Sequence, residues 1–172
     1  MLDGIHKIHL IGIGGSGMRA IANILIQKGY DVSGSDVAES AVISKFREMG
    51  ATVHIGHNKE YVNGVDAVVR STAIREDNPE IVAAKEQGIT ILHRSDIVKA
   101  VLDVTDGIAV AGAHGKTSTT SMIGQILVEA DADPTVIIGG EVDYLKGSSC
   151  LGKGHFSVVE ADESDGSFLK LR

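Results

Sequence analysis

Short apolar runs alternate with stretches of helical periodicity along the first hundred residues of this chain. The run at 7–11 is apolar and β-branched, ends at Gly12, and predicts a strand buried in a parallel sheet. Apolar residues then recur at helical spacing, and Gly29 follows them as a C-terminal cap; they are Met18, Ile21, Ala22, Leu25 and Ile26. The chain therefore opens with a strand and a helix joined by a glycine-rich loop.

The alternation continues to about residue 103. Further strands are predicted at 31–34, 52–55, 66–70 and 90–92. Further helices are predicted from Ser40 to Gly50, from Asn78-Pro79 to Gly88, and from a cap at Ser95 to Asp103. Because parallel crossovers are long and right-handed, this order predicts an α/β domain at 1–103, with a mainly parallel sheet and helices on both faces.

A polar segment at 103–106 separates this domain from a second strand–loop–helix sequence. Its strands are predicted at 107–111, 135–138 and 156–161, its helix at 116–130, and a Gly- and Ser-rich loop at 139–154. Three strands and one helix leave a sheet poorly covered. We therefore expect residues 104–172 to be an incomplete second domain.

Composition excludes several classes of protein. The formal net charge is −7, from 16 Lys and Arg against 23 Asp and Glu, and aromatic residues make up 3%, which disfavours nucleic-acid binding. The single cysteine, Cys150, excludes an intrachain disulfide and a cysteine-built zinc site. No apolar run reaches the roughly 18 residues that a membrane helix needs, and no signal-peptide pattern opens the chain. We expect a cytoplasmic protein.

The first candidate site is the G-x-G-x-x-G sequence between the first strand and helix. Its residues are Gly12, Gly14, Gly15, Ser16 and Gly17. This spacing allows a tight turn, close approach of a diphosphate, and close packing of helix on strand, while the helix N-terminus attracts an anion. Asp36 lies 19 residues after Gly17, at a position where ribose hydroxyls are commonly bound. The motif predicts a Rossmann-like nucleotide site without identifying the nucleotide, and a purely structural turn is the alternative.

The second candidate site opens the helix at 116. It consists of Gly112, Ala113, His114, Gly115, Lys116, Thr117 and Ser118. Backbone amides of such a loop cradle a phosphate, the lysine reaches the β- and γ-oxygens, and the threonine ligates Mg²⁺. The loop is two residues shorter than the usual P-loop, and a glycine turn with an exposed lysine is the alternative.

The third candidate site is acidic. Four carboxylates follow an apolar strand, at Glu160, Asp162, Glu163 and Asp165. Ligands of parallel sheets bind beyond the carboxyl ends of the strands, so Glu160 is expected to face the Mg²⁺ held by Thr117. The alternative is a solvated acidic loop. Three residues outside the acidic cluster complete the candidates, namely His114 within the phosphate loop, and His57 and Ser71 on the expected ligand side of the first sheet.

Together these segments resemble the Mur ligases of peptidoglycan synthesis. The resemblance rests on 12–18, 33–36, 71–79, 112–117 and 160–165, and it covers nearly the whole chain. It implies a UDP-substrate domain at 1–103, the beginning of a P-loop-type ATPase domain at 104–172, and a missing C-terminal domain of the same enzyme. The piece alone is then expected to be inactive.

The resemblance also implies an activity, a cofactor set and residue roles. Within the family, this chain most resembles the ligases of cell-wall synthesis that join L-alanine to the carboxylate of UDP-N-acetylmuramate. These ligases use ATP and Mg²⁺ and form an acyl phosphate. The residues of the first glycine loop would bind the UDP-sugar with Asp36, His57 and Ser71. Lys116, His114 and Glu160 would be catalytic.

Two positions depart from family patterns. Gly14 stands where the related ligase that recycles murein tripeptide usually has cysteine, and Ala113 stands where the phosphate loop usually has threonine. Two other functions stay open on the residues alone. A nicotinamide-dependent oxidoreductase would use the first loop and Asp36 but would leave the Gly-Lys-Thr segment and the acidic cluster at Glu160 unexplained. A nucleotide-binding module without catalysis is the other alternative.

Overall fold

The computed structural model describes residues 2–161 of the chain. Contacts divide this part into two compact units, Leu2–Arg94 and 95–161. The division falls at the start of helix α4 (Arg94–Leu102), so this helix groups with the second unit, although the sequence assigns it to the first. None of the helices between residues 2 and 161 is long and apolar enough to cross a membrane.

The first unit is built on a five-stranded parallel sheet with the order β3-β2-β1-β4-β5. Its strands are β1 (Lys7–Ile11), β2 (Asp31–Asp36), β3 (Thr52–Ile55), β4 (Ala67–Arg70) and β5 (Thr90–His93). Its helices are α1 (Ser16–Gln27), α2 (Ala41–Glu48), the 3-10 helix η1 (Lys59–Val62) and α3 (Pro79–Glu86). This is the doubly wound topology that the alternation of strands and helices predicts.

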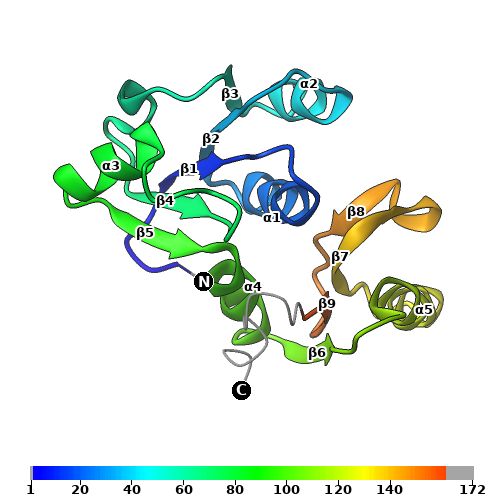
Figure 1. The fold of residues 1–172 in the computed structure, drawn as a ribbon. Helices are drawn as coiled ribbons and strands as arrows, with labels where there is room; N and C mark the ends of the chain where they lie inside the picture. Colours follow the sequence, from blue (N-terminus) through cyan, green and yellow to red (C-terminus); the bar gives the residue numbers. More distant parts are fainter. Residues whose placement is uncertain (1, 162–172) are drawn as a thin grey trace. The chain divides into compact units, whose positions relative to one another are not determined.

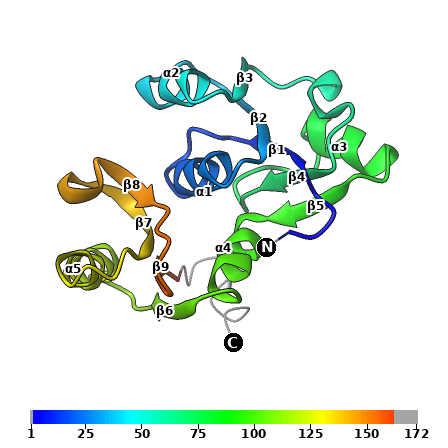
Figure 2. The ribbon, with the colours of Figure 1, turned by 180° about the vertical axis from the view of Figure 1, so that it is seen from behind.

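The helices of the first unit cover both faces of its sheet. Helices α1 and α2 lie on one face and α3 on the other (Figures 1 and 2). The chain moves outward through α1 and α2, returns to the far side of β1, and continues through α3, as right-handed crossovers require. The order of the strands reverses between β1 and β4. In such sheets, ligands bind beyond the strand ends at this point.

The core of the first unit contains β-branched strand residues and the inner faces of the helices. On the α3 side, one buried cluster joins the sheet to α3 and η1; it comprises Ile11, Val62, Val68, Ile81, Ala83 and Ala84. In α1, Ile21 and Leu25 are at most 1% exposed, and Leu10 in β1 is 0% exposed. Gly34 in β2 is required there, because a Cβ at this position would lie 2.7 Å from the Ile13 Cδ1 atom.

The second unit contains a four-stranded mixed sheet with the order β6-β9-β7-β8. Its elements after α4 are β6 (Asp106–Val110), α5 (Lys116–Glu129), β7 (Thr135–Val142), the 3-10 helix η2 (Asp143–Leu145), β8 (Gly147–Cys150) and β9 (Phe156–Glu160). Strand β9 runs parallel to β6 and β7, whereas β8 is antiparallel to β7. Helix α5 packs on β7 and β9 (Figure 1).

The structure differs from the sequence-based prediction in four elements. Strand β8 and helix η2 lie within 139–154, which is predicted as a loop. Ser95 lies inside α4 and is therefore not its N-cap. Strand β6 lies at the edge of the described sheet, and its side chains are largely exposed, which its apolar sequence does not predict.

Candidate functional site

The first glycine loop forms a tight turn between β1 and α1. Gly12 has a φ of +73°, a left-handed conformation that favours glycine. Its amide donates a 2.8 Å hydrogen bond to the carbonyl of Ser35 in β2, and the amide of Gly15 donates a 3.0 Å bond back to the carbonyl of Gly12. These bonds fix the loop at the carboxyl end of β1 and direct the chain into α1.

Asp36 is bound to this loop through its carboxylate. Its Oδ2 atom accepts a 2.8 Å hydrogen bond from the amide of Gly14, and its Oδ1 atom accepts one from the amide of Val37. A Cβ on Gly14 would lie 3.0 Å from Oδ2. Gly14 therefore makes room for Asp36, and its amide is already engaged within the protein.

Two other amides of the loop are available to a ligand. Within residues 2–161, the amides of Ser16 and Gly17 donate to no protein group, and Gly15 caps the helix without a side-chain bond. The first turn of α1 contains no acidic residue. The N-terminus of α1 therefore offers two donors and a partial positive charge to an anion.

Arg94 lies beside the same helix N-terminus, and the sequence analysis missed it. A Cβ on Gly17 would lie 2.9 Å from an Nη atom of Arg94, so the third glycine of the motif leaves room for a guanidinium group. Planar guanidinium groups bind phosphate oxygens well. The signal in the sequence was an arginine directly after β5, at the carboxyl ends of the strands, where ligands bind.

The other two residues predicted on the ligand side lie at strand ends near this loop. Ser71 directly follows β4, which neighbours β1 in the sheet, and it is half-buried. His57 lies two residues beyond β3, the strand that pairs with β2, and its side chain is 22% exposed. The amide of Gly56 donates to the carbonyl of Asp36, which holds the His57 segment beside the end of β2.

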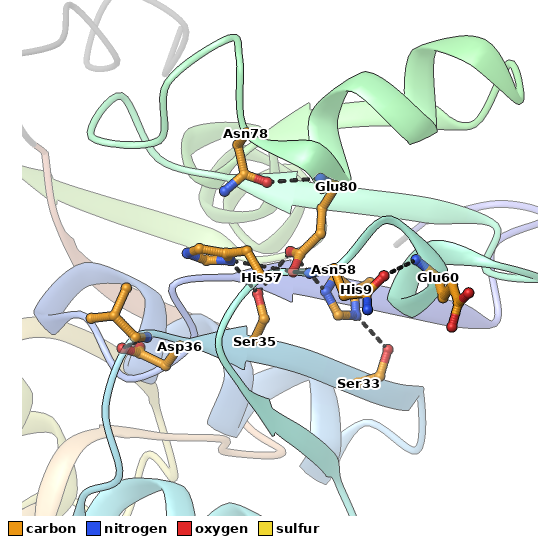
Figure 3. A network of polar contacts seen from close by, with 10 residues as sticks. His9, Ser33, Ser35, Asp36, His57, Asn58, Glu60, Asn78 and Glu80 are labelled. Atoms are coloured by element: carbon orange, nitrogen blue, oxygen red, sulfur yellow. Dashed lines mark hydrogen bonds and ion pairs between the residues drawn. The ribbon is translucent and has the colours of Figure 1, made fainter.

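A buried carboxylate, which the sequence analysis did not identify, lies beside His57 (Figure 3). Glu80, in the first turn of α3, is 0% exposed and accepts hydrogen bonds from four groups; these are His9, Ser35, His57 and the amide of Asn58. Burial favours a higher pKa for Glu80, but the hydrogen bonds from His9, Ser35 and Asn58 and the electrostatic effect of His9 outweigh it, so the pKa of Glu80 lies below its ordinary value. The available signal was His9, a polar residue between the apolar residues of β1.

The phosphate loop of the second unit joins β6 to α5. Gly115 has a φ of +77° and occupies the N-cap of α5 without a side-chain bond. Within the described residues, the amides of Lys116, Thr117 and Ser118 donate to no protein group. The Lys116 Nζ atom donates a 2.6 Å hydrogen bond to the carbonyl of Gly112, so the lysine folds over its own loop. This arrangement of free amides and one lysine can bind a phosphate group.

Glu160 lies at the same edge of the second sheet. It pairs in register with Val110, the last residue before the phosphate loop, and its Oε2 atom accepts a hydrogen bond from the Gly139 amide. Its Oε1 atom is buried and has no partner within residues 2–161. Thr117 approaches the neighbouring glycine, since a Cβ on Gly140 would lie 3.3 Å from the threonine methyl group. The free carboxylate oxygen and the Thr117 hydroxyl are hard oxygen ligands of the kind that Mg²⁺ prefers.

The remaining candidates are less constrained. His114 is exposed and makes no bond with another residue of the described chain. Asp162, Glu163 and Asp165 lie outside the described residues. Within residues 2–161, no group of three or more His, Cys, Asp or Glu residues could hold a metal ion. A metal ion at Thr117 and Glu160 would therefore need further oxygens from a bound nucleotide.

Known proteins are similar to this chain in sequence and in fold. Residues 7–104 match the model of the Mur ligase family, catalytic domain. The chain is 49% identical over 167 residues to the UDP-N-acetylmuramate–L-alanine ligase of Sulfurihydrogenibium sp. (strain YO3AOP1), an alignment that covers 97% of this chain and 37% of that protein. The chain thus spans little more than a third of the length of this curated relative.

Two solved structures match both units in sequence order. The UDP-N-acetylmuramate-alanine ligase of Thermotoga maritima has a TM-score of 0.85 at 36% identity, over 92% of this chain and 37% of that chain. The UDP-N-acetylmuramate:L-alanyl-gamma-D-glutamyl-meso-diaminopimelate ligase of Neisseria meningitidis has a TM-score of 0.84 at 28% identity, over 94% and 54%. The matched family model covers more than half of the sequence, and the chain belongs to the Mur ligase family.

Proposed function

We propose that this chain supplies the UDP-sugar site and the phosphate loop of an ATP-dependent ligase that joins L-alanine to the carboxylate of UDP-N-acetylmuramate. The proposal rests most directly on the Gly-Lys-Thr loop, which follows β6 at the same end of the sheet as Glu160, whose Oε1 atom is buried without a partner within residues 2–161. A nicotinamide-dependent oxidoreductase needs neither group. Two relatives that are UDP-N-acetylmuramate–L-alanine ligases are 49% and 36% identical to this chain, which supports the choice of amino acid.

The first unit would bind the UDP-sugar by its diphosphate. The amides of Ser16 and Gly17, which donate to no group of the described residues, and the guanidinium of Arg94 supply positive charge at one helix N-terminus. Asp36 and Ser71 would contact ribose or uracil from the neighbouring strand ends. Asp36 can do so because each carboxylate oxygen accepts more than the one backbone bond it already has.

The second unit would bind ATP. Ligand phosphates would take the amides of 116–118 and draw the Lys116 ammonium away from the Gly112 carbonyl. Mg²⁺, held by the phosphates with Thr117 and Glu160, would neutralise charge that develops on the γ-phosphate. His114 is exposed in the same loop and would orient the γ-phosphate. Because ATP and a nucleotide sugar are the substrates, we place the reaction in the cytoplasm.

The reaction would proceed in two steps. A carboxylate oxygen of the muramyl group attacks the γ-phosphorus of ATP, which forms an acyl phosphate and releases ADP. The amine of L-alanine then attacks the acyl carbon, and phosphate leaves as the amide forms. Phosphoryl transfer of this kind depends chiefly on positioning and charge neutralisation, which are the roles proposed for Lys116 and Glu160. Since the relatives are more than twice as long, both steps are proposed for a protein of their length.

Binding to the 172-residue chain tests the proposal. UDP-N-acetylmuramate, Mg²⁺-ATP and NADH are titrated separately while heat or the unfolding temperature is recorded. A ligand at 100 times its Kd stabilises the native state by about 2.7 kcal/mol. We expect the UDP-sugar and ATP to stabilise the chain independently and NADH to have no effect. Stabilisation by NADH without any by the UDP-sugar would overturn the proposal.

A further inference from the structure

The buried carboxylate of Glu80 accepts hydrogen bonds from four donors, which lie in two strands and one loop. Its Oε2 atom accepts from Ser35 Oγ at 2.7 Å and from His9 Nε2 at 3.3 Å. Its Oε1 atom accepts from His57 Nδ1 and from the amide of Asn58, each at 3.2 Å. Glu80 also lies in the first turn of α3, where the helix dipole favours a negative charge. The carboxylate is therefore held ionised in a fully buried position.

Only one of these side chains reaches the surface. His9 and Ser35 are 0% exposed, and His9 bonds further inward to Ser33. The His57 side chain is 22% exposed, whereas that of Glu80 is 0% exposed. Burying a charge costs free energy that apolar residues of similar volume would not require. The hydrogen bonds around Glu80 thus link a buried charge to one partly exposed ring, that of His57, beside the candidate site.

The charge of Glu80 determines which nitrogen of the His57 ring is available to a ligand. An ionised carboxylate only accepts hydrogen bonds, so His57 Nδ1 must carry the proton that is donated to it. Ser35 Oγ, 3.2 Å from the same nitrogen, donates its own proton to Glu80 and can accept from His57 as well. With Nδ1 directed inward, Nε2 lies on the opposite, exposed edge of the ring. The His57 ring lies on the same side of Glu80 as Asp36 (Figure 3).

We infer that Glu80 is a positioning residue, which fixes the orientation and tautomer of His57 so that Nε2 faces the nucleoside of a UDP ligand. The inference rests on the proposed UDP-sugar site. His57 follows β3 beside the end of β2, where Asp36 meets the first glycine loop. Nucleosides bind at these strand ends in doubly wound sheets when the diphosphate lies on the first helix.

The pattern of donors makes glutamine the conservative substitution. In Glu80→Gln, one oxygen becomes an NH₂ group, which two of the four donors would have to face. Ser35 can rotate its hydroxyl and His9 can exchange its tautomer against Ser33, whereas the Asn58 amide can only donate. The amide oxygen is therefore expected on the side of His57 and Asn58. Glu80→Met keeps the volume, but it removes every acceptor.

The test combines ring nitrogen spectra with UDP affinity in the 172-residue chain. Two-bond ¹H–¹⁵N correlation spectra report the protonation of each histidine nitrogen, and loss of a signal in His57→Ala assigns His57. We expect a protonated Nδ1 in the free protein and a shift at Nε2, with little change at Nδ1, when UDP is added. This measurement requires no substitution at Glu80.

Calorimetric titration with UDP supplies the second readout. In Glu80→Met, His57 loses the hydrogen bond that orients it, and with it the proposed contact to UDP. Loss of one such contact predicts about tenfold weaker UDP binding, with most of the affinity restored in Glu80→Gln. In a His57→Ala background, Glu80→Met should weaken UDP binding no further. Ser33→Ala is the matched control, because it loosens the same network on the His9 side and should leave UDP affinity unchanged.

The outcomes separate this inference from the proposed function. If UDP binds but Nε2 carries the proton in free neutral His57, or the ring signals do not respond to UDP, the positioning role is wrong and the UDP site stands. If Ser33→Ala weakens UDP binding as much as Glu80→Met does, Glu80 has a merely structural role. If UDP does not bind, the proposed UDP-sugar site is wrong, and the positioning role falls with it.

Discussion

The Glu160 carboxylate lies directly against Gly139, with its Oε2 atom 2.5 Å from the glycine amide nitrogen. A Cβ on Gly139 would also lie 2.5 Å from Oε2, a separation that bonded neighbours alone would tolerate. The absence of a side chain at Gly139 is thus what lets the carboxylate of Glu160, the last residue of β9, lie against β7. Glycine at this position has a role in the proposed ATP site although it contacts no phosphate itself.

The first prediction concerns this glycine. Gly139→Ala should displace the Glu160 carboxylate and weaken Mg²⁺-dependent ATP binding by about tenfold, the scale of one charged contact. Calorimetric titration of ATP with and without Mg²⁺ measures the effect. Gly147→Ala is the control, since a Cβ there meets no atom within 4 Å in the same sheet. Equal Mg²⁺ dependence in the two variants would show that Glu160 does not hold the metal.

The second prediction concerns the first glycine loop. Gly14→Val should push the Asp36 carboxylate away, because a Cβ would lie 3.0 Å from Oδ2 and 3.7 Å from the Ile43 Cδ1 atom. We expect UDP-N-acetylmuramate to bind about tenfold more weakly or worse, with the fold largely retained. Gly14→Ala should have a smaller effect, and ATP affinity should not change in either variant. Unchanged UDP-sugar affinity in Gly14→Val would place the diphosphate elsewhere.

Local sequence signals predicted most of the fold. Strand β1 has the predicted bounds, and Asn78 caps α3 as predicted, with its side chain accepting from the amide of Glu80. Both features depend on a few neighbouring residues and on apolar periodicity. Strand β8 was missed because its sequence, Gly-Ser-Ser-Cys, carries no apolar alternation. Its order comes from antiparallel pairing with β7.

Long-range polar contacts were not predictable in the same way. Glu80 is a charged residue in a short helix, and its partners at His9, Ser35 and His57 lie 71, 45 and 23 residues away. Nothing in the local pattern of α3 indicates that this side chain is fully buried. Arg94 likewise reaches Gly17 across the sheet, and only the strand order brings the two together. The motifs thus identified the glycine loops but missed the side chains that surround them.

The third prediction is a loss of stability in acid that depends on Glu80. Its pKa lies below the ordinary 4.5, so the unfolded chain binds this proton more tightly than the folded chain does. The contribution of Glu80 to the free energy of unfolding is therefore complete above pH 4.5 and is lost as pH falls through the folded pKa. Urea unfolding between pH 7 and pH 3 measures it.

Glu80→Gln provides the comparison for this acid titration. Its unfolding free energy should decline less steeply below pH 4.5 than that of the unsubstituted chain. Asp66, Glu76 and Asp77, whose pKa values are also lowered, should maintain a residual slope in both. Parallel profiles would mean that Glu80 titrates alike in the folded and unfolded chains.

The fourth prediction concerns a glycine inside α5, where replacement by alanine ordinarily stabilises a helix by up to about 1 kcal/mol. Gly124 is an exception, because a Cβ there would overlap the Tyr144 hydroxyl and lie 3.2 Å from both methyl groups of Val136. We expect Gly124→Ala to lower the free energy of unfolding by about 1–3 kcal/mol, the usual cost of overpacking. Urea unfolding followed by circular dichroism measures the change.

The Tyr144 hydroxyl makes the origin of this cost testable. It donates a 3.1 Å hydrogen bond to the Ser121 carbonyl, which holds it over Gly124. Tyr144→Phe removes the hydroxyl, so Gly124→Ala should cost less in that background than alone, and the remaining cost should reflect Val136. If Gly124→Ala instead stabilises the unsubstituted chain, helix propensity outweighs packing at this position, and α5 does not contact Tyr144 and β7 as closely as described.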